Sequence, residues 1–338
     1  MADTSTTGGK VRFRIDRSED PVQNIAPFNE SQRFEGVAFS PSGDVLAVVA
    51  SDADTVLLFK RMENGRFEDA PFSFITGAAS GINYPHDASF SDLGDSQLLA
   101  VAQRRGAISI FERPKPEPHF RRKPAFEILG AEARLSHSDA VAFIPSDNAQ
   151  LAVCNLTNNT VSFYRRTSSS PIRFGLEPVF VLEHDSLCGP DGLTFSSCGR
   201  WLAIANHGDH TVSIFQRSSD SKDGHALRYE PEPVSVIAHP SLRHPHSVVF
   251  TPRTHHLVIT SAGTNYFSVH EPTGPPHARV WSNAPVIQET VGSESIFREM
   301  NAQNKMEGGP KGIAIHDNTL AVCSPQYGVT IYTFREYD

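Results

Sequence analysis

Short apolar segments separated by polar turns repeat along the whole chain of 338 residues. One unit reads Gly-Val-Ala-Phe-Ser-Pro-Ser-Gly-Asp-Val-Leu-Ala-Val-Val over residues 36–49, and Thr-Val-Leu-Leu-Phe-Lys-Arg follows over residues 55–61. A second unit repeats this pattern over residues 192–205 and 211–217. Such short segments, rich in β-branched and aromatic residues and bounded by Gly, Asn, Asp and Pro, are typical of β-strands. The chain is therefore predicted to be all-β.

An apolar anchor ends the first strand of each unit and fixes the length of the repeat. The six anchors are Phe39, Phe90, Phe143, Phe195, Phe250 and Ile315. Their spacings of 51, 53, 52, 55 and 65 residues divide almost the whole chain into six units. Each unit adds two further apolar segments and, in all but the last, a more variable fourth one, and four strands repeated radially describe a β-propeller blade. Residues 1–338 are thus expected to form one six-bladed β-propeller domain with four-stranded blades.

The sixth unit lacks a fourth strand, because the sequence ends shortly after its third. The segment Val11–Ile15 reads Val-Arg-Phe-Arg-Ile, an alternation that suits an outermost strand with one face in water. We expect this segment to complete the last blade by pairing with Val329–Thr333. Closure of this kind would remove the exposed sheet edges of an open array.

The composition is that of an ordinary globular protein with an acidic balance. The chain has 38 Asp+Glu against 30 Lys+Arg, which gives a formal net charge of -8. Phosphate binding needs a basic face, so nucleic acid is not expected as a partner. No apolar run approaches the ~18 residues that span a bilayer, and Met1–Lys10 is polar, so we expect no membrane association and a cytoplasmic location. Four cysteines are too few for a disulfide scaffold.

Six ionisable side chains share one position in the repeat, four residues before each anchor. They are Glu35, His86, Asp139, Asp191, His246 and Lys311, and we call them the polar ring. The first strand of each propeller blade runs beside the central channel, so these side chains are expected to meet at one channel mouth. With neutral His their formal charge is -2, which one divalent cation would balance. Two His with carboxylates also suit a first-row metal, and Zn or Ca is the candidate cofactor.

If the polar ring holds a ligand, its members divide into three chemical roles. The carboxylates Glu35, Asp139 and Asp191 are candidate metal ligands or general bases. The imidazoles of His86 and His246 are candidate metal ligands or proton carriers, and Lys311 is a site for an anionic substrate group. A channel mouth that is polar only because water fills it is the alternative interpretation.

The ends of the second strands are expected to add a second tier of ligand-binding groups on the same face. This tier comprises Gln103, Arg104, Asn155, Asn206, His207, Ser261 and Ser324.

The connection between the fifth and sixth units is the longest, and its composition differs from the rest. Within Ser293–Met306, Glu, Arg, Met, Ala, Gln and Lys are good helix formers, so a short helix is predicted. The connection joins an outer strand to the next inner one, so the helix is expected to cross the channel mouth as a partial lid. An ordered surface turn without a covering role is the alternative. A basic, proline-rich loop at Arg113–Pro124 is expected on the opposite face, as a solvated loop or a docking site for an acidic partner.

Two kinds of motif resemble known propellers. Residues 190–195, Pro-Asp-Gly-Leu-Thr-Phe, and 310–315, Pro-Lys-Gly-Ile-Ala-Ile, resemble the core of NHL and YVTN-type propeller repeats. That resemblance covers essentially the whole chain and implies the fold, but such propellers include lactonases, lyases, lectins and scaffolds. Residues 85–87, Pro-His-Asp, and 245–247, Pro-His-Ser, resemble the Pro-His motifs that hold a catalytic zinc in propeller-type peptidylamidoglycolate lyases. Those enzymes use three His where this chain has two, and Lys311 stands beside them, so the resemblance implies a ligating position and not the lyase activity.

Two classes of function remain open at the level of sequence. The first is a site at the channel mouth for a divalent metal or a small polar or anionic ligand, with hydrolase, lactonase or lyase chemistry. The second is a non-catalytic scaffold that binds a protein partner through its loops, with the polar ring merely hydrated.

Overall fold

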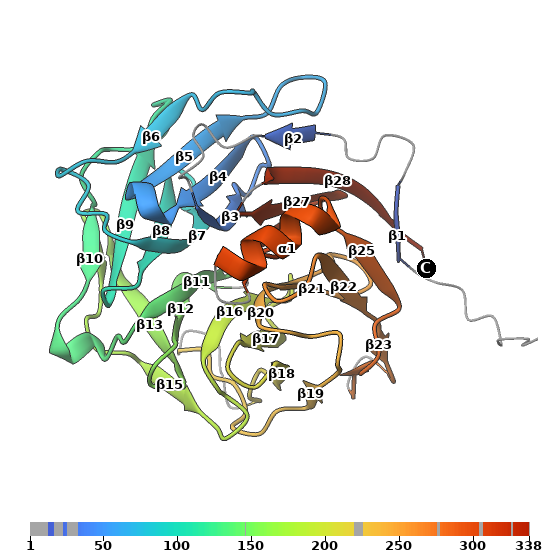
Figure 1. Cartoon of the computed structure of the whole chain (residues 1–338). Coiled ribbons are helices and arrows are strands. Elements are labelled where there is room, and N and C mark those ends of the chain that lie inside the picture. The colour runs from blue at the N-terminus through green and yellow to red at the C-terminus, as the bar shows by residue number, and fades with distance from the viewer. Residues whose placement is uncertain are drawn as a thin grey trace, which may run out of the picture.

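Six β-sheets of four or five strands surround a central axis in the computed structural model of the chain (Figure 1). The structure describes residues 13–16, 23–25, 33–145, 147–219, 226–275, 278–303, 307–325 and 327–337. Each sheet is antiparallel and begins with the strand nearest the axis. The prediction of a six-bladed β-propeller is confirmed.

The first three blades follow one another along the chain. Blade 1 contains β3 (Phe34–Phe39), β4 (Val45–Ala50), β5 (Thr55–Lys60) and β6 (Ser73–Ile75). Blade 2 contains β7 (Pro85–Asp92), β8 (Ser96–Gln103), β9 (Ala107–Pro114) and β10 (Phe126–Ile128). Blade 3 contains β11 (Ser138–Ile144), β12 (Asp147–Asn155), β13 (Thr160–Ser169), β14 (Ile172–Phe174) and β15 (Phe180–Glu183). Short 3-10 turns lie at Ser51–Ala53 and Ala131–Ala133.

The last three blades repeat this arrangement, and the sixth includes two short strands from the N-terminal region. Blade 4 contains β16 (Pro190–Phe195), β17 (Trp201–Asn206), β18 (Thr211–Gln216) and β19 (Ser235–Ile237). Blade 5 contains β20 (Pro245–Phe250), β21 (Leu257–Ser261), β22 (Tyr266–His270) and β25 (Ile287–Thr290), with a small ribbon of β23 (Pro272–Thr273) and β24 (Val280–Trp281). Blade 6 contains β26 (Ile313–His316), β27 (Thr319–Ser324), β28 (Gly328–Glu336), β1 (Phe13–Ile15) and β2 (Gln23–Ile25).

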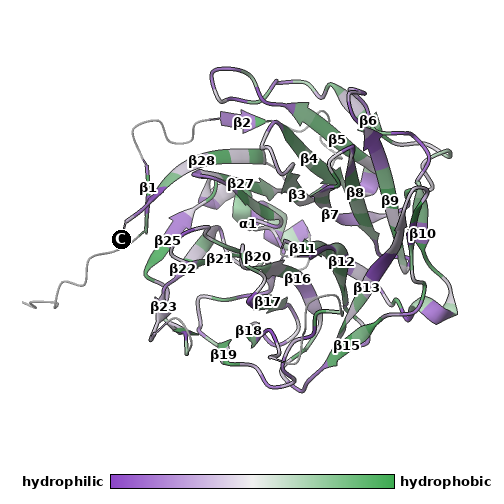
Figure 2. Cartoon of the chain, turned by 180° about the vertical axis from the view of Figure 1, so that it is seen from behind, coloured by the Kyte–Doolittle hydropathy of each residue, from purple (hydrophilic) through white to green (hydrophobic). Residues whose placement is uncertain are grey.

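The hydrophobic core lies between the blades, which explains why the second strands are continuously apolar. In β4, Leu46 and Val48 pack in the cluster shared with blade 6. Their neighbours Ala47 and Val49 pack in the cluster shared with blade 2. Both faces of the strand are covered, so alternation with polar residues is not needed. Figure 2, seen from the opposite side, shows hydrophobic colouring along inner strands such as β4 and β12.

The N-terminal region closes the ring, but not in the predicted register. Phe13–Ile15 pairs with residues 336–334 of β28, and β2 pairs with residues 331–329. Pairing of Val11–Ile15 with Val329–Thr333 is therefore wrong in register, and residues 11 and 12 lie outside the described part. The reason is that β28 is nine residues long and holds two short strands along its outer edge. The Gln23 side chain fixes the second one, because its amide both accepts from Phe67 N and donates to Phe67 O, each at 2.8 Å.

One helix, α1 (Glu294–Gln303), lies within the segment predicted to be helical and crosses the centre of the ring in Figure 1. Residues 304–306 of that prediction lie outside the described part. Asn265 Nδ2 of blade 5 donates to Glu294 Oε2 at 2.6 Å, and Gly308 N donates to Asn301 Oδ1 at 3.2 Å. A Cβ atom at Gly309 would lie 1.8 Å from Thr264 O, so only glycine lets the chain return this closely past blade 5. No helix in the described part is both long and apolar enough to cross a bilayer.

Candidate functional site

β-Bulges place the members of the polar ring. In each of five blades the pairing of the first and second strands shifts register at the ring residue. The shift lies between Phe34 and Gly36, on either side of Glu35, and between Pro85 and Asp87, on either side of His86. The same shift occurs at the positions of the other ring carboxylates and of the second His. A bulged residue is left out of the ladder and can point its side chain in a new direction. The repeat therefore turns one residue per blade toward the axis.

All six ring side chains are buried, with exposures between 0% and 4%. Glu35 lies at the centre of their contacts. Its Oε2 is 3.1 Å from His246 Nε2, 3.7 Å from His86 Nε2 and 3.7 Å from Lys311 Nζ. The two imidazole rings stack with centroids 5.0 Å apart. The structure thus brings together the ring that the shared register predicts.

Asp139 and Arg104 fix the orientation of His86. Arg104 Nε and Nη2 donate to the two carboxylate oxygens of Asp139 at 2.9 and 3.1 Å. Arg104 Nη2 also lies 2.9 Å from His86 Nε2, and His86 Nδ1 lies 2.9 Å from the main-chain oxygen of Asp139. A guanidinium has no acceptor, so Nε2 must accept and Nδ1 must carry the proton. The lone pair of His86 that could bind a metal is consequently held by Arg104.

Asp191 is the one ring carboxylate with an unsatisfied atom. Its Oδ1 is buried and has no hydrogen-bond partner, and its Oδ2 lies 3.8 Å from His246 Nε2. Burial, followed by the neighbouring charge of Asp139, raises the pKa of Asp191 well above its usual range. The side chain lines a cavity of about 10 Å³ that it shares with Glu35, His86, Asp139 and His246. That volume suffices for about one water molecule or ion.

The two imidazoles of the ring are neutral, whereas Glu35 is ionised. Burial lowers the pKa of His86 to about 3 and that of His246 to about 4, so both are neutral at physiological pH. Burial acts against the ionised form of Glu35, but Lys311 and the hydrogen bond from His246 hold its pKa well below its usual range. Neutral imidazole beside an ionised carboxylate is the charge state that metal binding requires. Because His246 Nε2 donates its proton to Glu35, ligation by this nitrogen also requires the tautomer with the proton on Nδ1.

Two charged residues of the site come from outside the repeat position and are absent from the sequence prediction. Glu307, just after α1, lies 2.6 Å from Lys311 Nζ, 3.2 Å from His207 Nε2 and 3.6 Å from Arg33 Nη2. Arg33 also forms an ion pair with Glu35. Glu307 belongs to a non-repeated connection, so no register could have found it, whereas Arg33 is only two residues before Glu35.

The surrounding charges change the electrostatic argument for a cation. Four carboxylates, those of Glu35, Asp139, Asp191 and Glu307, face three cations, Arg33, Arg104 and Lys311. A fifth carboxyl group, that of Asp87, lines the same cavity, and burial raises its pKa to about 7. With neutral His and a protonated Asp87 the formal charge is -1, rather than the -2 of the six ring residues alone. A proton on Asp191 would balance it, so charge alone does not demand a divalent ion.

The second tier divides into residues that reach the ring and residues that do not. Arg104 contacts the ring directly, and His207 reaches it through Glu307. Asn155 and Asn206 instead donate across their own hairpins, to Ser162 and Ser213. Gln103 donates to Ser109, and the hydroxyl of Ser324 accepts from Tyr327 N. Ser261 is buried beside the return of the chain after α1, where its carbonyl oxygen lies near Gly309.

The blade geometry explains this division. In five of the blades the last residue of the second strand pairs with the first residue of the third, as Asn155 does with Thr160. A short amide there reaches the adjacent hydroxyl groups of its own blade, whereas the next residue, in the turn, has the longer reach toward the axis. Arg104 and His207 both stand at that later position.

Comparisons with known proteins support the class of fold defined by these blades. No family model matches the chain, and no curated protein matches it. Among solved structures, the β-propeller domain of Myceliophteria thermophila Cps50 (Swd1) has a TM-score of 0.56 at 12% identity, covering 89% of this chain and 97% of that one. A functionally unknown protein from Desulfotomaculum acetoxidans DSM 771 has a TM-score of 0.55 at 11% identity, covering 90% of each chain. At these identities the likeness concerns the fold alone.

Proposed function

We propose that the polar ring binds one divalent metal ion at the channel mouth. The observation that carries the proposal is the convergence of Glu35, His86 and His246, whose donor atoms all lie within 4.8 Å of one another and are all buried. Ligand atoms around a tetrahedral metal with bonds of ~2.1 Å lie about 3.4 Å apart. The separations of Glu35 Oε2 from the two imidazoles, 3.1 and 3.7 Å, bracket that value.

Asp191 suits the role of a fourth ligand. Its buried Oδ1 has no hydrogen-bond partner and lies 3.8 Å from His86 Nδ1, and the side chain faces a cavity of about 10 Å³ with the other candidate ligands. A cation there would supply the missing partner and favour the ionised carboxylate, which burial otherwise disfavours. An unsatisfied buried oxygen beside three other donors is the arrangement expected of a site built for an ion.

Two cationic side chains, those of Arg104 and Lys311, would repel the metal ion and lower its affinity for the site. Arg104 holds His86 Nε2, but its side chain is 24% exposed and can withdraw toward solvent. Lys311 is 1% exposed and cannot leave, so it would weaken metal binding and remain available for an anionic group. A bound divalent metal would act as a Lewis acid toward a substrate oxygen. Lys311 would then orient the substrate's anionic group, and Asp139, which is not among the proposed ligands, would exchange a proton with the substrate.

The volume of the cavity restricts any catalytic role. An organic substrate needs a pocket of several hundred Å³, whereas about 10 Å³ is present beneath α1 and Glu307. We therefore propose that α1 and Glu307 act as a lid, and that hydrolase, lactonase or lyase chemistry requires its displacement. Glu307 supports this role because it connects the lid to Lys311, Arg33 and His207.

A non-catalytic scaffold is the second candidate. The specific observation in its favour is the near balance of charges, because Arg33, Arg104 and Lys311 neutralise three of the four carboxylates. Under this function the polar ring is a hydrogen-bonded network that holds the inner strands together, and partner proteins bind the outer surfaces.

Calorimetric titration distinguishes the metal site from the scaffold function. The full-length protein is treated with a chelator and then titrated with zinc chloride and, separately, with calcium chloride. The metal site predicts one equivalent bound by wild type and no binding by His86→Ala or His246→Ala. His239→Ala is the matched control, since His239 bonds Ser241 outside the ring. If wild-type protein binds neither zinc nor calcium, the metal site is wrong and the scaffold function is favoured.

The proposal also includes a repeat family and a cellular location for the chain. The Pro-x-Gly motifs at residues 190–192 and 310–312 support membership of the NHL or YVTN type of repeat. All four cysteines are free thiols, which supports a reducing compartment such as the cytoplasm.

A further inference from the structure

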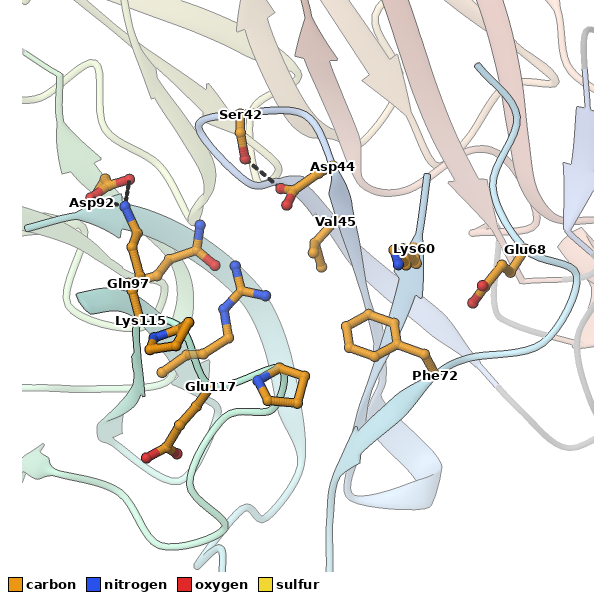
Figure 3. Close-up of a pocket in the computed structure, with 13 residues that line it drawn as sticks. Ser42, Asp44, Val45, Lys60, Glu68, Phe72, Asp92, Gln97, Lys115 and Glu117 are labelled. Carbon is orange, nitrogen blue, oxygen red and sulfur yellow. Dashed lines mark hydrogen bonds and ion pairs between the residues drawn. The ribbon is translucent and has the colours of Figure 1, made fainter. Parts of the chain in front are cut away.

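A second cavity lies between blades 1 and 2 at the end of the strands remote from the polar ring. It has a volume of about 590 Å³, and Figure 3 shows Val45, Lys60, Phe72 and Gln97 around it. Gln97 is the second residue of β8, whereas Gln103, near the ring, ends that strand. The residues of the loop after β9, including Pro116 and Pro118, form one wall. We call this cavity the interblade groove, and its volume is in the range of ordinary ligand pockets.

Two unsatisfied polar atoms lie next to each other in the interblade groove. Gln97 is 1% exposed, and its Oε1 accepts no hydrogen bond. Arg113 Nε is buried and donates none. These residues are direct cross-strand partners of β8 and β9, so their side chains leave the same face of the blade. The site therefore presents one free acceptor beside one free donor.

The surrounding side chains keep this pair free. Asp92, which could bind Arg113, is held by Lys115 Nζ at 2.8 and 3.0 Å. Asp44 accepts from the Ser40 hydroxyl at 2.6 Å. The Arg113 guanidinium is held over the Phe120 ring, 5.6 Å from its centroid. Buried polar groups are nearly always paired, so an adjacent donor and acceptor without partners point to a ligand that provides both.

The chemistry of the groove favours a neutral ligand group. Three cationic and four anionic side chains line it, so its formal charge of -1 offers no attraction to a phosphate or other polyanion. Val45, Phe72 and the two prolines supply apolar walls. A peptide main chain offers N–H and C=O groups on one edge, together with apolar side chains for such walls.

We propose that the interblade groove binds an extended peptide segment of a partner protein, with Gln97 Oε1 accepting a main-chain N–H and Arg113 Nε donating to a main-chain carbonyl. The site is independent of the polar ring, because the two lie at opposite ends of the blades. It also gives a defined location to the docking role considered for the Arg113–Pro124 loop, with a different chemistry from an acidic partner.

The test uses the full-length protein and a phage-displayed library of random peptides, whose enriched members are resynthesised with a fluorescent label. Fluorescence anisotropy then compares wild type with Gln97→Leu, which removes the acceptor at similar volume. Gln97→Glu is a second variant, since its carboxylate would pair with Arg113 inside the protein and close the site. Lys123→Gln, exposed on the same loop and outside the groove, is the control. Thermal melting followed by circular dichroism verifies that each variant is folded.

The proposal predicts that enriched peptides bind wild type and Lys123→Gln within twofold of each other and bind both Gln97 variants at least about tenfold more weakly. Failure to enrich any peptide over beads without protein overturns it. Enriched peptides that bind the Gln97 variants as tightly as wild type overturn it as well, because they then occupy another surface. Neither outcome bears on metal binding by the polar ring.

Discussion

Lys311 Nζ and Glu307 Oε2 form an ion pair of 2.6 Å that ties the segment after α1 to the polar ring. Lys311 is almost completely buried, and Glu307 contacts both this ring residue and His207. Glu307 therefore adds an ionic link between the segment after α1 and the ring to the hydrogen bonds that Asn265 and Tyr327 form at the start of the helix. Burial acts against its ionised form, but His207 and Lys311 together hold the pKa of Glu307 below its usual range.

Replacing Glu307 with Gln should release α1 from the channel mouth. The amide cannot form the ion pairs with Lys311 and His207, so we expect amide hydrogen exchange in residues 294–303 to accelerate at least about tenfold. The exposed Glu299→Gln is the matched control and should leave exchange unchanged. Exchange in Glu307→Gln equal to that of wild type would show that α1 is held by other contacts.

The closure of the ring by two N-terminal strands gives a second prediction. Phe13 is fully buried and stacks on Phe334 of β28, with centroids 5.1 Å apart. Phe13→Ala should lower the free energy of unfolding by about 3 kcal/mol, because it leaves a cavity in a closed core. Urea denaturation measures this loss, with the neighbouring exposed Arg14→Ala as control. A loss below about 0.5 kcal/mol, typical of surface substitutions, would contradict the closure by β1.

Sequence periodicity predicted the fold and the polar ring because both depend on the repeat. One anchor per blade sets the register, and the bulge at the ring residue of five blades follows from that register. Glu307 and β2 lie outside the repeat, so their positions depend on tertiary contacts such as those of Gln23 with Phe67. The second tier was only partly predictable. The short Asn side chains form their hydrogen bonds within their own hairpins, whereas the longer Arg104 side chain reaches the polar ring.

A buried histidine away from the ring predicts how stability depends on pH. His270, at the end of β22, is fully buried, and burial lowers its pKa from 6.5 to about 4, despite a hydrogen bond to Ser282 O. Between these values the unfolded chain binds a proton that the folded protein does not. Stability is therefore complete above pH 6.5 and falls as the pH falls toward 4.

His270→Gln should remove this contribution. Between pH 7 and pH 4 its free energy of unfolding should fall by about 2–3 kcal/mol less than that of wild type. Urea denaturation at each pH measures the difference, and the exposed His119→Gln is the control. Equal acid sensitivity of wild type and His270→Gln would show that His270 does not titrate in this way.

The cation beside the proposed ligands gives a prediction about metal affinity. Lys311 Nζ lies 3.7 Å from Glu35 Oε2 and repels any ion bound there. Lys311→Met should raise the affinity for zinc at least about tenfold, since two like charges this close interact by several kcal/mol even at an effective dielectric constant of ~20. Competition with a chromogenic zinc chelator measures the change, and exposed Lys60→Met is the control. Weaker zinc binding by Lys311→Met would mean that Lys311 supports the site rather than opposing it.

Anomalous diffraction shows whether a metal ion binds among the polar-ring side chains. Crystals of the full-length protein grown with zinc would be measured at wavelengths on either side of the zinc absorption edge. The account predicts one anomalous peak in the channel, within about 2.3 Å of Glu35 Oε2, His86 Nε2 and His246 Nε2, with Arg104 moved off His86. The pair of His207 and His244, whose ring centroids lie 4.6 Å apart outside the ring, provides an internal comparison. A channel without a peak, or zinc bound only at His207 and His244, would contradict the account.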